Sequence, residues 1–342
     1  MIGSAKQVVK SGDVLLSRIV PHIRRSWVVS NGSDRRTIAS GEWIVFRSNR
    51  VHPDYLRHVL VGDSFYSEFM RTVSGVGGSL LRARPAYVAQ IKIPLPPLAE
   101  QRRIAEVLDR ADALRAKRRA ALAQLDSLTQ SIFLDLFGDP VVNTRGWKIS
   151  TIGEVAERIT KGESPKWQGF EYQEEGALFV TSENVRLGEL DISSPKFIPL
   201  EFHSKLSRSQ LKIGDLLVNL VGASIGRSCI FDSWNGPANV NQAVGVITLD
   251  KSLIETRFLA NLLTSSSGQN LLLGNRVEAA RANISLTDLR ESKIPLPPRT
   301  LQNEFVRRIA RVDRQRVANT VSLQQLGLLC SSLQDRAFRG AL

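Results

Sequence analysis

Side chains that could perform catalysis are scattered through this sequence and form no recognisable constellation. Its four histidines lack the spacing of metal ligands; they are His22, His52, His58 and His203. Residues 222–228 have the glycine-rich look of a phosphate-binding loop, but the GxxxxGK[ST] spacing and the lysine of that motif are missing. We therefore expect a protein that is not an enzyme and that carries no metal or cofactor of its own.

Cationic turns favour binding to an anion instead. The turn at residues 222–227 combines backbone N–H groups with the hydroxyl of Ser224 and the guanidinium of Arg227, which suits contact with a phosphate. Arg24 and Arg25 lie at the matching place in the first half of the chain. The alternative for each of these residues is a turn cap or a solvated loop.

Amide side chains follow on the next expected strand, at Asn239, Asn241 and Gln242. An amide can make two hydrogen bonds to the edge of an adenine, so these residues are candidates for reading a base. Asn283, just before the last strand, is another candidate. Two cations and an aromatic ring also share a loop rich in Gly, Ser and Pro: Lys161, Lys166 and Trp167.

The charge of the chain agrees with an anionic partner. It has 46 Lys and Arg against 33 Asp and Glu, a net charge of +13. The surplus lies in residues 1–97, with 14 basic and 6 acidic residues, and in residues 293–342, with 9 and 3. Nucleic acid is the commonest partner of such a chain, whereas the alternative is a surface that only keeps the protein soluble.

An internal repeat organises the elements that must position these residues. The sequence KIPLPP occurs at residues 92–97 and again at 293–298, an offset of 201. Its prolines enforce extended backbone, and a long helical pattern follows each copy, the first over residues 98–137. Both helices carry an apolar stripe at heptad-like spacing; the seam residues are Ile104, Leu108, Leu125, Ile132, Phe305, Val312, Leu326 and Leu333. Arg115 and Arg118 fall at the positions of Arg316 and Asn319, so four polar groups are expected to meet if the helices pair antiparallel.

The repeat continues upstream of the prolines. GDVLL at residues 12–16 matches GDLLV at 214–218, and both are expected to be short strands joined by tight turns. Short helical stretches follow at residues 54–70 and 256–263. Residues 147–212 have no counterpart in the first copy, so the first domain is expected to lack its front half. Such a domain would expose apolar surface, which favours self-association or completion by another fragment.

Composition fits a chain of about two globular domains, with 342 residues of which 42% are hydrophobic. The two cysteines, Cys229 and Cys330, lie in apolar patterns and are expected to be small core residues in a reduced, cytoplasmic setting. No apolar stretch is long enough to cross a membrane, and no signal peptide is recognisable.

The order of these motifs resembles the specificity (S) subunits of type I restriction–modification systems. The strongest match is IPLPPLAEQRRI at residues 93–104 with its long helix, and further matches lie at residues 180–185, 214–217 and 283–286. The resemblance implies an α/β (α+β) fold with two target-recognition domains, each followed by a long helix, and an antiparallel coiled coil of the two helices. It also implies four segments: a partial first domain (1–91), a spacer (92–140), a complete second domain (141–292) and a second spacer (293–342).

The function implied by the resemblance is recognition of a split target in double-stranded DNA. The partners would be methyltransferase subunits, which bind S-adenosylmethionine, and restriction subunits. The residues expected to contact DNA are Lys161, Lys166, Trp167, Ser182, Asn184, Ser224, Arg227, Asn241, Asn283, Arg24 and Arg25. One strict half-site and one lax or absent half-site are expected.

Three alternatives remain open from the sequence. The chain could be a coiled-coil interaction protein with a non-specific basic surface, a non-functional truncated subunit, or a fused methylase. The last would need an S-adenosylmethionine motif, which is not recognisable in the sequence.

Overall fold

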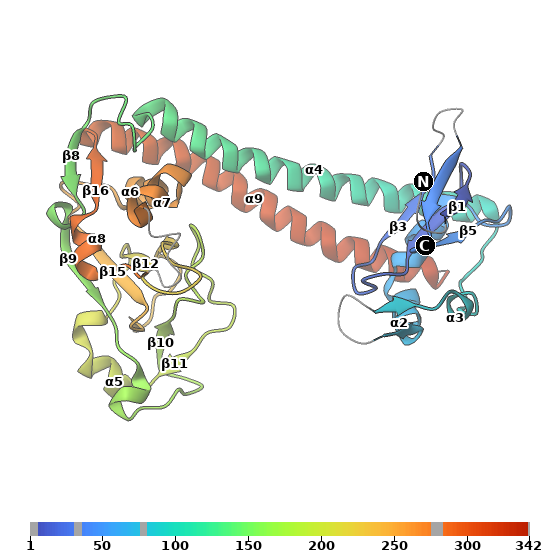
Figure 1. The fold of residues 1–342 in the computed structure, drawn as a ribbon, viewed down its shortest axis with the longest axis horizontal. Helices are drawn as coiled ribbons and strands as arrows, with labels where there is room; N and C mark the ends of the chain where they lie inside the picture. Colours follow the sequence, from blue (N-terminus) through green and yellow to red (C-terminus); the bar gives the residue numbers. More distant parts are fainter. Residues whose placement is uncertain (1–5, 31–35, 76–80, 275–282, 341–342) are drawn as a thin grey trace. The chain divides into compact units, whose positions relative to one another are not determined.

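The computed structural model describes residues 6–30, 36–75, 81–274 and 283–340 (Figure 1). The chain divides into two compact units, residues 1–123 with 317–342 and residues 124–316. Each unit contains one domain of mixed helix and sheet and one end of each long helix. The predicted fold class is confirmed.

The second domain contains a four-stranded antiparallel sheet in the order β13-β12-β15-β9. Its strands are β9 (Ala156–Lys161), β12 (Leu216–Asn219), β13 (Ser228–Ile230) and β15 (Val244–Leu249). A second sheet has the order β11-β10-β14, in which β10 and β14 are parallel. Its strands are β10 (Ala177–Val180), β11 (Phe197–Ile198) and β14 (Ala238–Val240). All residues of β10 and β12 are buried, which explains why they are apolar apart from Asn219 at the end of β12.

Helix α6 (Thr256–Thr264) attaches this domain to its end of the long helices. The domain also contains α5 (Leu200–Lys205), α7 (Ser266–Leu273) and α8 (Leu286–Glu291). The ring of Phe258 on α6 lies 4.7 Å from Phe137 and 5.7 Å from Phe133, between ring centroids. Phe305 joins the same cluster at 5.4 Å from Phe137. Buried aromatic area of this kind fixes a domain to a helix firmly.

The first domain repeats part of this plan. Its sheet β3-β2-β5 matches β13-β12-β15, and β1 pairs with β4. The strands are β1 (Lys6–Val9), β2 (Val14–Ser17), β3 (Ser26–Val28), β4 (Thr37–Ser40), β5 (Trp43–Phe46), β6 (Val73–Ser74) and β7 (Arg82–Ala83). The helices are α1 (Pro53–Val61), α2 (Asp63–Arg71) and α3 (Pro85–Val88). The helical stretch expected over residues 54–70 is therefore two helices, because the backbone is extended at Gly62.

Backbone hydrogen bonds recur between the domains at equivalent positions. The amide of Ser17 donates to the carbonyl of Arg25 at 3.0 Å, and that of Asn219 donates to Arg227 at 2.8 Å. The glycines that precede Asp13 and Asp215 both adopt positive φ, +83° and +95°, which a side chain would strain. The duplication read from the sequence is thus a duplication of structure.

The long helices are α4 (Leu98–Phe137) and α9 (Arg299–Phe338), which lie side by side (Figure 1). In the first unit, Arg118 donates to the Oδ1 atom of Asn319 at 3.0 Å. In the second unit, Arg316 donates to Asp126 at 2.8 Å. Residue numbers on one helix rise as those of their partners fall, so the helices are antiparallel, as predicted.

The expected cluster of four polar groups forms in part: Arg118 meets Asn319, whereas Arg316 pairs with Asp126. Arg115 pairs with Asp112 on its own helix at 3.2 Å, and the side chain of Arg118 is exposed, although Asn319 is buried. The reason is that a long side chain on a thin two-helix seam can turn towards solvent or towards its own helix.

The predicted seam residues have two different roles. Ile104 and Leu108 are buried with Tyr55 and Val59 of α1, and Phe305 is buried in the core of the second domain. These residues therefore anchor a domain to a helix. Val312 is also buried, whereas the remaining four are half-buried, as a two-helix pair allows: Leu125, Ile132, Leu326 and Leu333.

A buried glutamine fastens each domain to the start of its helix. The Oε1 atom of Gln101 accepts from the backbone amide of His52 at 2.7 Å, and its Nε2 atom donates to the carbonyl of Pro96 at 2.8 Å. Gln302 makes the equivalent bonds to Glu255 and Pro297, each at 2.8 Å. Both side chains are almost fully buried, and such satisfied amides rigidify a junction.

The two proline motifs differ in their pairing. The second copy contains β16 (Lys293–Leu296), which pairs with β8 (Lys148–Thr151). Within the described residues the first copy forms no strand. The segment that supplies β8 belongs to residues 147–212, which have no counterpart in the first copy.

Candidate nucleic-acid interface

Strand pairing in the second domain brings four loops to one end of its sheets. The end of β9 lies opposite the start of β15, since Lys161 pairs with Gly245. The end of β12 lies at the same place, since Asn219 pairs with Val244. The parallel strands β10 and β14 end together as well. We call the loops that follow these strands, residues 161–164, 181–187, 220–227 and 241–243, together with Asn283, the second-domain rim.

Backbone contacts hold the rim together. The amide of Gly162 donates to the carbonyl of Asn241 at 3.2 Å, and the amide of Asn241 donates to Val180 at 3.0 Å. A Cβ atom at Gly162 would lie 1.6 Å from the carbonyl oxygen of Val240, so only glycine fits there. Asn283 forms a β-bridge with Val221 and joins the rim from the far end of the sequence.

Asn219, which is not among the residues predicted from the sequence, organises two of these loops. Its buried Nδ2 group donates to the carbonyls of Ser182 and Val185 at 2.9 and 3.3 Å. It also donates to the Oγ atom of Ser224 at 3.0 Å. The only signal for this role is an asparagine at the end of a wholly apolar strand. Because buried N–H donors need acceptors, this Nδ2 group fixes the loops that supply them.

Seven of the predicted DNA-contacting residues lie on this rim: Lys161, Ser182, Asn184, Ser224, Arg227, Asn241 and Asn283. The side chains of Lys161 and Asn283 are exposed, and that of Arg227 is half-buried. Among the described residues, no side-chain hydrogen bond or ion pair engages Lys161 or Arg227. Two cations are thus available to an anion at this end of the domain.

Other predicted residues have their polar groups engaged inside the protein. The Oδ1 atom of Asn184 accepts from the amide and hydroxyl of Thr181 at 2.8 and 3.0 Å, and its Nδ2 group donates to Asp191. Asn239 is fully buried, with its amide donating to Leu206 and Ser209. The Oδ1 atom of Asn241 caps the amide of Ala243 at 3.1 Å. The structure therefore gives Asn184 and Asn239 structural roles.

Lys166 and Trp167 lie beyond the rim, in the short 3-10 helix Pro165–Gln168. Trp167 is 73% exposed, and Lys166 is also exposed. The loop then packs Phe170 against Phe202 of α5, with ring centroids 5.1 Å apart. The ring of Trp167 and the cation of Lys166 are accessible. The contact between Phe170 and Phe202 directs the rest of the loop towards α5.

The first domain carries its cations at the corresponding end. Arg25 is exposed, and its carbonyl accepts the amide of Ser17, as the carbonyl of Arg227 accepts that of Asn219. Arg25 and Arg227 are therefore structural equivalents. Arg24 instead pairs with Asp63 at 2.5 Å, and its guanidinium lies 4.0 Å from the ring centroid of Tyr66. It is fixed against α2.

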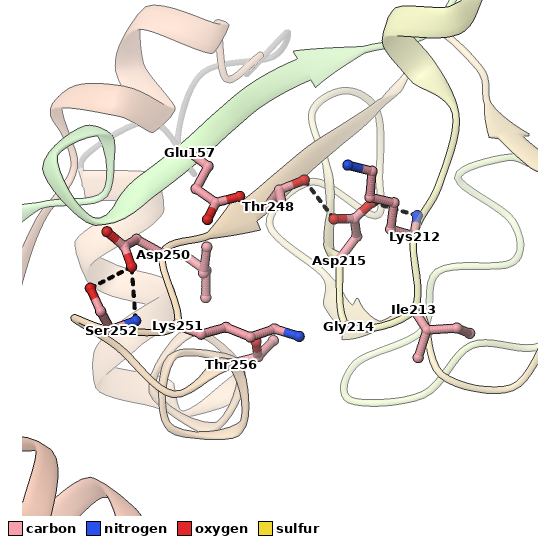
Figure 2. Close-up of a pocket in the computed structure, with 11 residues that line it drawn as sticks. Glu157, Lys212, Ile213, Gly214, Asp215, Thr248, Asp250, Lys251, Ser252 and Thr256 are labelled. Atoms are coloured by element: carbon pink, nitrogen blue, oxygen red, sulfur yellow. Dashed lines mark hydrogen bonds between the residues drawn. The ribbon is translucent and has the colours of Figure 1, made fainter.

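A recess lies at the opposite ends of β12 and β15 from the rim (Figure 2). Three carboxylates and two lysines line it: Glu157, Asp215, Asp250, Lys212 and Lys251. The carboxylate of Asp215 accepts from Thr248 at 2.6 Å and from the amide of Lys212 at 2.8 Å, and that of Asp250 accepts from Ser252 (Figure 2). The hydrogen bonds of Asp215 and Asp250 are made within the protein, which indicates a structural role for these two carboxylates.

Groups suited to other chemistry are not assembled. In the part of the chain that the structure describes, no three His, Cys, Asp or Glu side chains cluster to hold a metal ion. Burial raises the pKa of the Cys229 thiol to about 12, which makes it an unreactive core residue. Among the described helices, none is both long and apolar enough to cross a membrane.

Comparison with known proteins places these features in a family. Residues 31–124 and 144–326 match the model of the type I restriction modification DNA specificity domain. The chain is 28% identical over 333 residues to the specificity subunit of the type I restriction enzyme EcoBI from Escherichia coli, covering 87% of this chain and 68% of the relative. It is 28% identical over 235 residues to the MjaVIII specificity subunit from Methanocaldococcus jannaschii, covering 65% and 55%.

Solved structures share the fold at low sequence identity. A chain from a structure of a type I restriction–modification system has a TM-score of 0.61 at 21% identity, covering all of this chain and 85% of that one. The S subunit from M. genitalium has a TM-score of 0.60 at 13% identity, covering 97% and 84%.

Proposed function

Because the chain belongs to the type I restriction modification DNA specificity domain family, we propose that it is the DNA-recognition subunit of a type I restriction–modification complex. In this proposal each domain reads one part of a split target, and the paired helices α4 and α9 set the distance between the two parts. The chain itself performs no catalytic step.

The observation that carries this proposal is the second-domain rim. Strand ends that are far apart in sequence present exposed Lys161, half-buried Arg227 and the amides of Asn241 and Asn283 at one edge of the domain. Cations neutralise phosphates, and amides can distinguish bases, so the rim combines positioning with readout. Asn219 holds the loops in place for both roles.

The two arginines at equivalent positions, Arg25 and Arg227, suit a phosphate contact in either domain. Asn241 and Asn283 are the proposed base readers in the second domain, and Ser182 and Ser224 are proposed to line the same interface. Lys166 and Trp167 are proposed to contact DNA beside the rim. Asn184 is not included, since both ends of its side-chain amide are bonded within the protein. Arg24 is not included either, since Asp63 and the ring of Tyr66 hold its guanidinium against α2.

Partners follow from the same family. Methyltransferase subunits carrying S-adenosylmethionine are the proposed catalytic partners, and restriction subunits the proposed nuclease partners. The net charge of +13 supports DNA as the third partner. A cytoplasmic location is proposed with them, since all of these partners act on chromosomal or incoming DNA.

A gel-shift titration with and without added methyltransferase subunits tests the proposal. Arg227→Ala is expected to weaken binding to every sequence and to reduce the salt slope by about one, as loss of one phosphate contact does. Asn283→Ala is expected to cost about 1–3 kcal/mol at one base pair only. Lys251→Ala, an exposed cation at the opposite end of β15, is the matched control and is expected to change neither quantity.

Two results would contradict the proposal. DNA binding that does not respond to methyltransferase subunits and shows no preferred sequence would favour the alternative of a coiled-coil interaction protein. Equal and sequence-blind losses from Arg227→Ala and Asn283→Ala would show that the readout residues lie elsewhere.

A further inference from the structure

The first domain has an edge that is equivalent to the second-domain rim, because backbone hydrogen bonds at matching positions recur in both domains. The amide of Arg18 donates to the carbonyl of Glu42 at 3.0 Å, as the amide of Leu220 donates to Ala243 at 2.8 Å. The amide of Ala83 donates to the carbonyl of Arg18 at 2.9 Å, as that of Ile284 donates to Leu220 at 2.8 Å.

A β-bridge extends this alignment to Arg82. Arg82 bridges Ile19 in the first domain, whereas Asn283 bridges Val221 in the second. Arg82 is therefore the structural equivalent of Asn283, and Glu42 is the equivalent of Ala243. Neither pairing is visible from sequence identity, because the residues differ at both positions.

The rims agree at one position and differ at these two. Arg25 and Arg227 are both arginines, as a contact with the sequence-independent backbone of DNA would require. At the positions of Asn283 and Ala243, the first domain has a cation and a carboxylate. Differences confined to such positions are expected where two domains read different bases.

The guanidinium of Arg82 is oriented by the carboxylate of Glu42. Its Nε atom lies 3.3 and 3.4 Å from the two carboxylate oxygens, and its Nη2 atom lies 3.2 Å from Oε1. Both side chains are a little over one-third exposed. A planar fork that a carboxylate holds in place loses less freedom on binding than a mobile one, and its charge is balanced within the protein.

From this geometry we propose that Arg82 reads a guanine in the part of the target contacted by the first domain, with Glu42 as its positioning residue. The proposal rests on the proposed function. An arginine fork matches the O6 and N7 acceptors of guanine, whereas the amide at the equivalent Asn283 matches adenine. The two domains thus differ in base preference at one equivalent position of the rim.

The test uses the full chain with methyltransferase subunits and a pool of randomised DNA duplexes, with sequencing of the bound fraction. Arg82→Ala is expected to lower the preference for guanine at one position roughly ten- to a hundredfold. Arg82→Lys keeps the charge but not the fork, so it is expected to lose the same preference while overall affinity and salt slope stay close to wild type. Glu42→Ala, which copies the second domain, is expected to weaken the preference partially.

The control is Arg71→Ala on α2, an exposed arginine that also pairs with a glutamate, at 2.6 Å from Glu68. It is expected to leave every base preference unchanged. Variants at Arg82 that keep the base preferences of the wild type would overturn the assignment of Arg82 but not the proposed function. The same holds for variants that lose affinity equally for all sequences and have a smaller salt slope. Wild-type protein without any preferred base would overturn the proposed function and this assignment together.

Discussion

The guanidinium of Arg47, the residue after β5, holds the buried carboxylate of Asp13, with Nε–Oδ1 and Nη2–Oδ2 distances of 2.7 and 2.5 Å. This contact keeps the pKa of Asp13 below its ordinary value. The equivalent carboxylate, Asp215, receives its cation from the neighbouring strand instead, since Arg158 on β9 lies 2.9 Å away. At the position of Arg47 the second domain has Thr248, which donates to Asp215. The two domains balance the same buried charge from different strands.

The cation that pairs with Asp215 is expected to be movable from position 158 to position 248 without loss of most of the stability it provides. Arg158→Ala should destabilise the second domain by roughly 1–3 kcal/mol, because it removes the cation while Thr248 and the amide of Lys212 still bond to Asp215. Adding Thr248→Arg, which copies Arg47, should restore at least half of that loss. Hydrogen exchange at the amides of β12 and β15 measures the effect within this domain alone. Thr248→Arg that lowers stability further on the Arg158→Ala background would contradict the equivalence of the two solutions.

The buried glutamine at the start of α9 is expected to be essential for the junction. Gln302→Glu keeps the shape but replaces the donor that serves the carbonyl of Pro297, so it should cost roughly 1–3 kcal/mol. Gln324→Glu, an exposed glutamine on the same helix, is the control and should stay within about 0.5 kcal/mol of wild type. Denaturant unfolding compares the two. A similar stability for both variants would remove the junction role from Gln302.

The polar pair on the helix seam is expected to trade stability for register. Replacing both Arg118 and Asn319 by leucine should raise the thermal midpoint, because Asn319 is buried among apolar residues of the seam. The same variant should form more oligomers by light scattering, since apolar seams pair with less discrimination. Calorimetry gives the thermal midpoint and light scattering gives the oligomeric state, both for the same sample. A lower midpoint without any change in oligomeric state would count against this role.

Burial gives the first domain a pH dependence. His58 is 1% exposed; its Nε2 atom lies 2.8 Å from Asp109. Burial and then the charge of Arg57 lower its pKa, against the opposing effect of Asp109. The unfolded chain therefore binds a proton more readily, so stability should fall as the pH drops below about 6.5, by at most ~1.4 kcal/mol per pH unit. His58→Gln should flatten this dependence in denaturant unfolding measured from pH 7 to about pH 5. An equal slope in both proteins would assign the effect to other groups.

The duplication and the long helices could be predicted because each leaves a linear signal. KIPLPP repeats at a fixed offset, and the helix predicted over residues 98–137 has the bounds found for α4. The helix predicted over residues 54–70 breaks at Gly62, although a glycine inside a helical pattern is itself a local sign of a break. The close approach of Phe338 cannot be read from the sequence: a Cβ atom at Gly62 would lie 3.0 Å from its ring.

The rim could be predicted only in part, since loop residues of one type have different fates. Asn184 and Asn241 look alike in sequence, but Asn184 is surrounded by Thr181 and Asp191, whereas Asn241 lies at a turn on the rim. Arg82 lies at the repeat offset of 201 from Asn283, but the two residue types differ, so their equivalence becomes evident only through the bridge to Ile19, more than sixty residues away. Which polar group stays accessible is decided by tertiary contacts.

The bond between Arg118 and Asn319 joins residues separated by 201 positions, the offset of the repeat itself. Each residue therefore meets its own counterpart, as residues on a two-fold axis do in a homodimer. Two copies of the first repeat would place like charges together at this point, whereas the unlike pair gives a donor an acceptor. The seam is thus more complementary between the two repeats of one molecule than between two first repeats from separate molecules, and self-pairing is disfavoured at the centre of the helix pair.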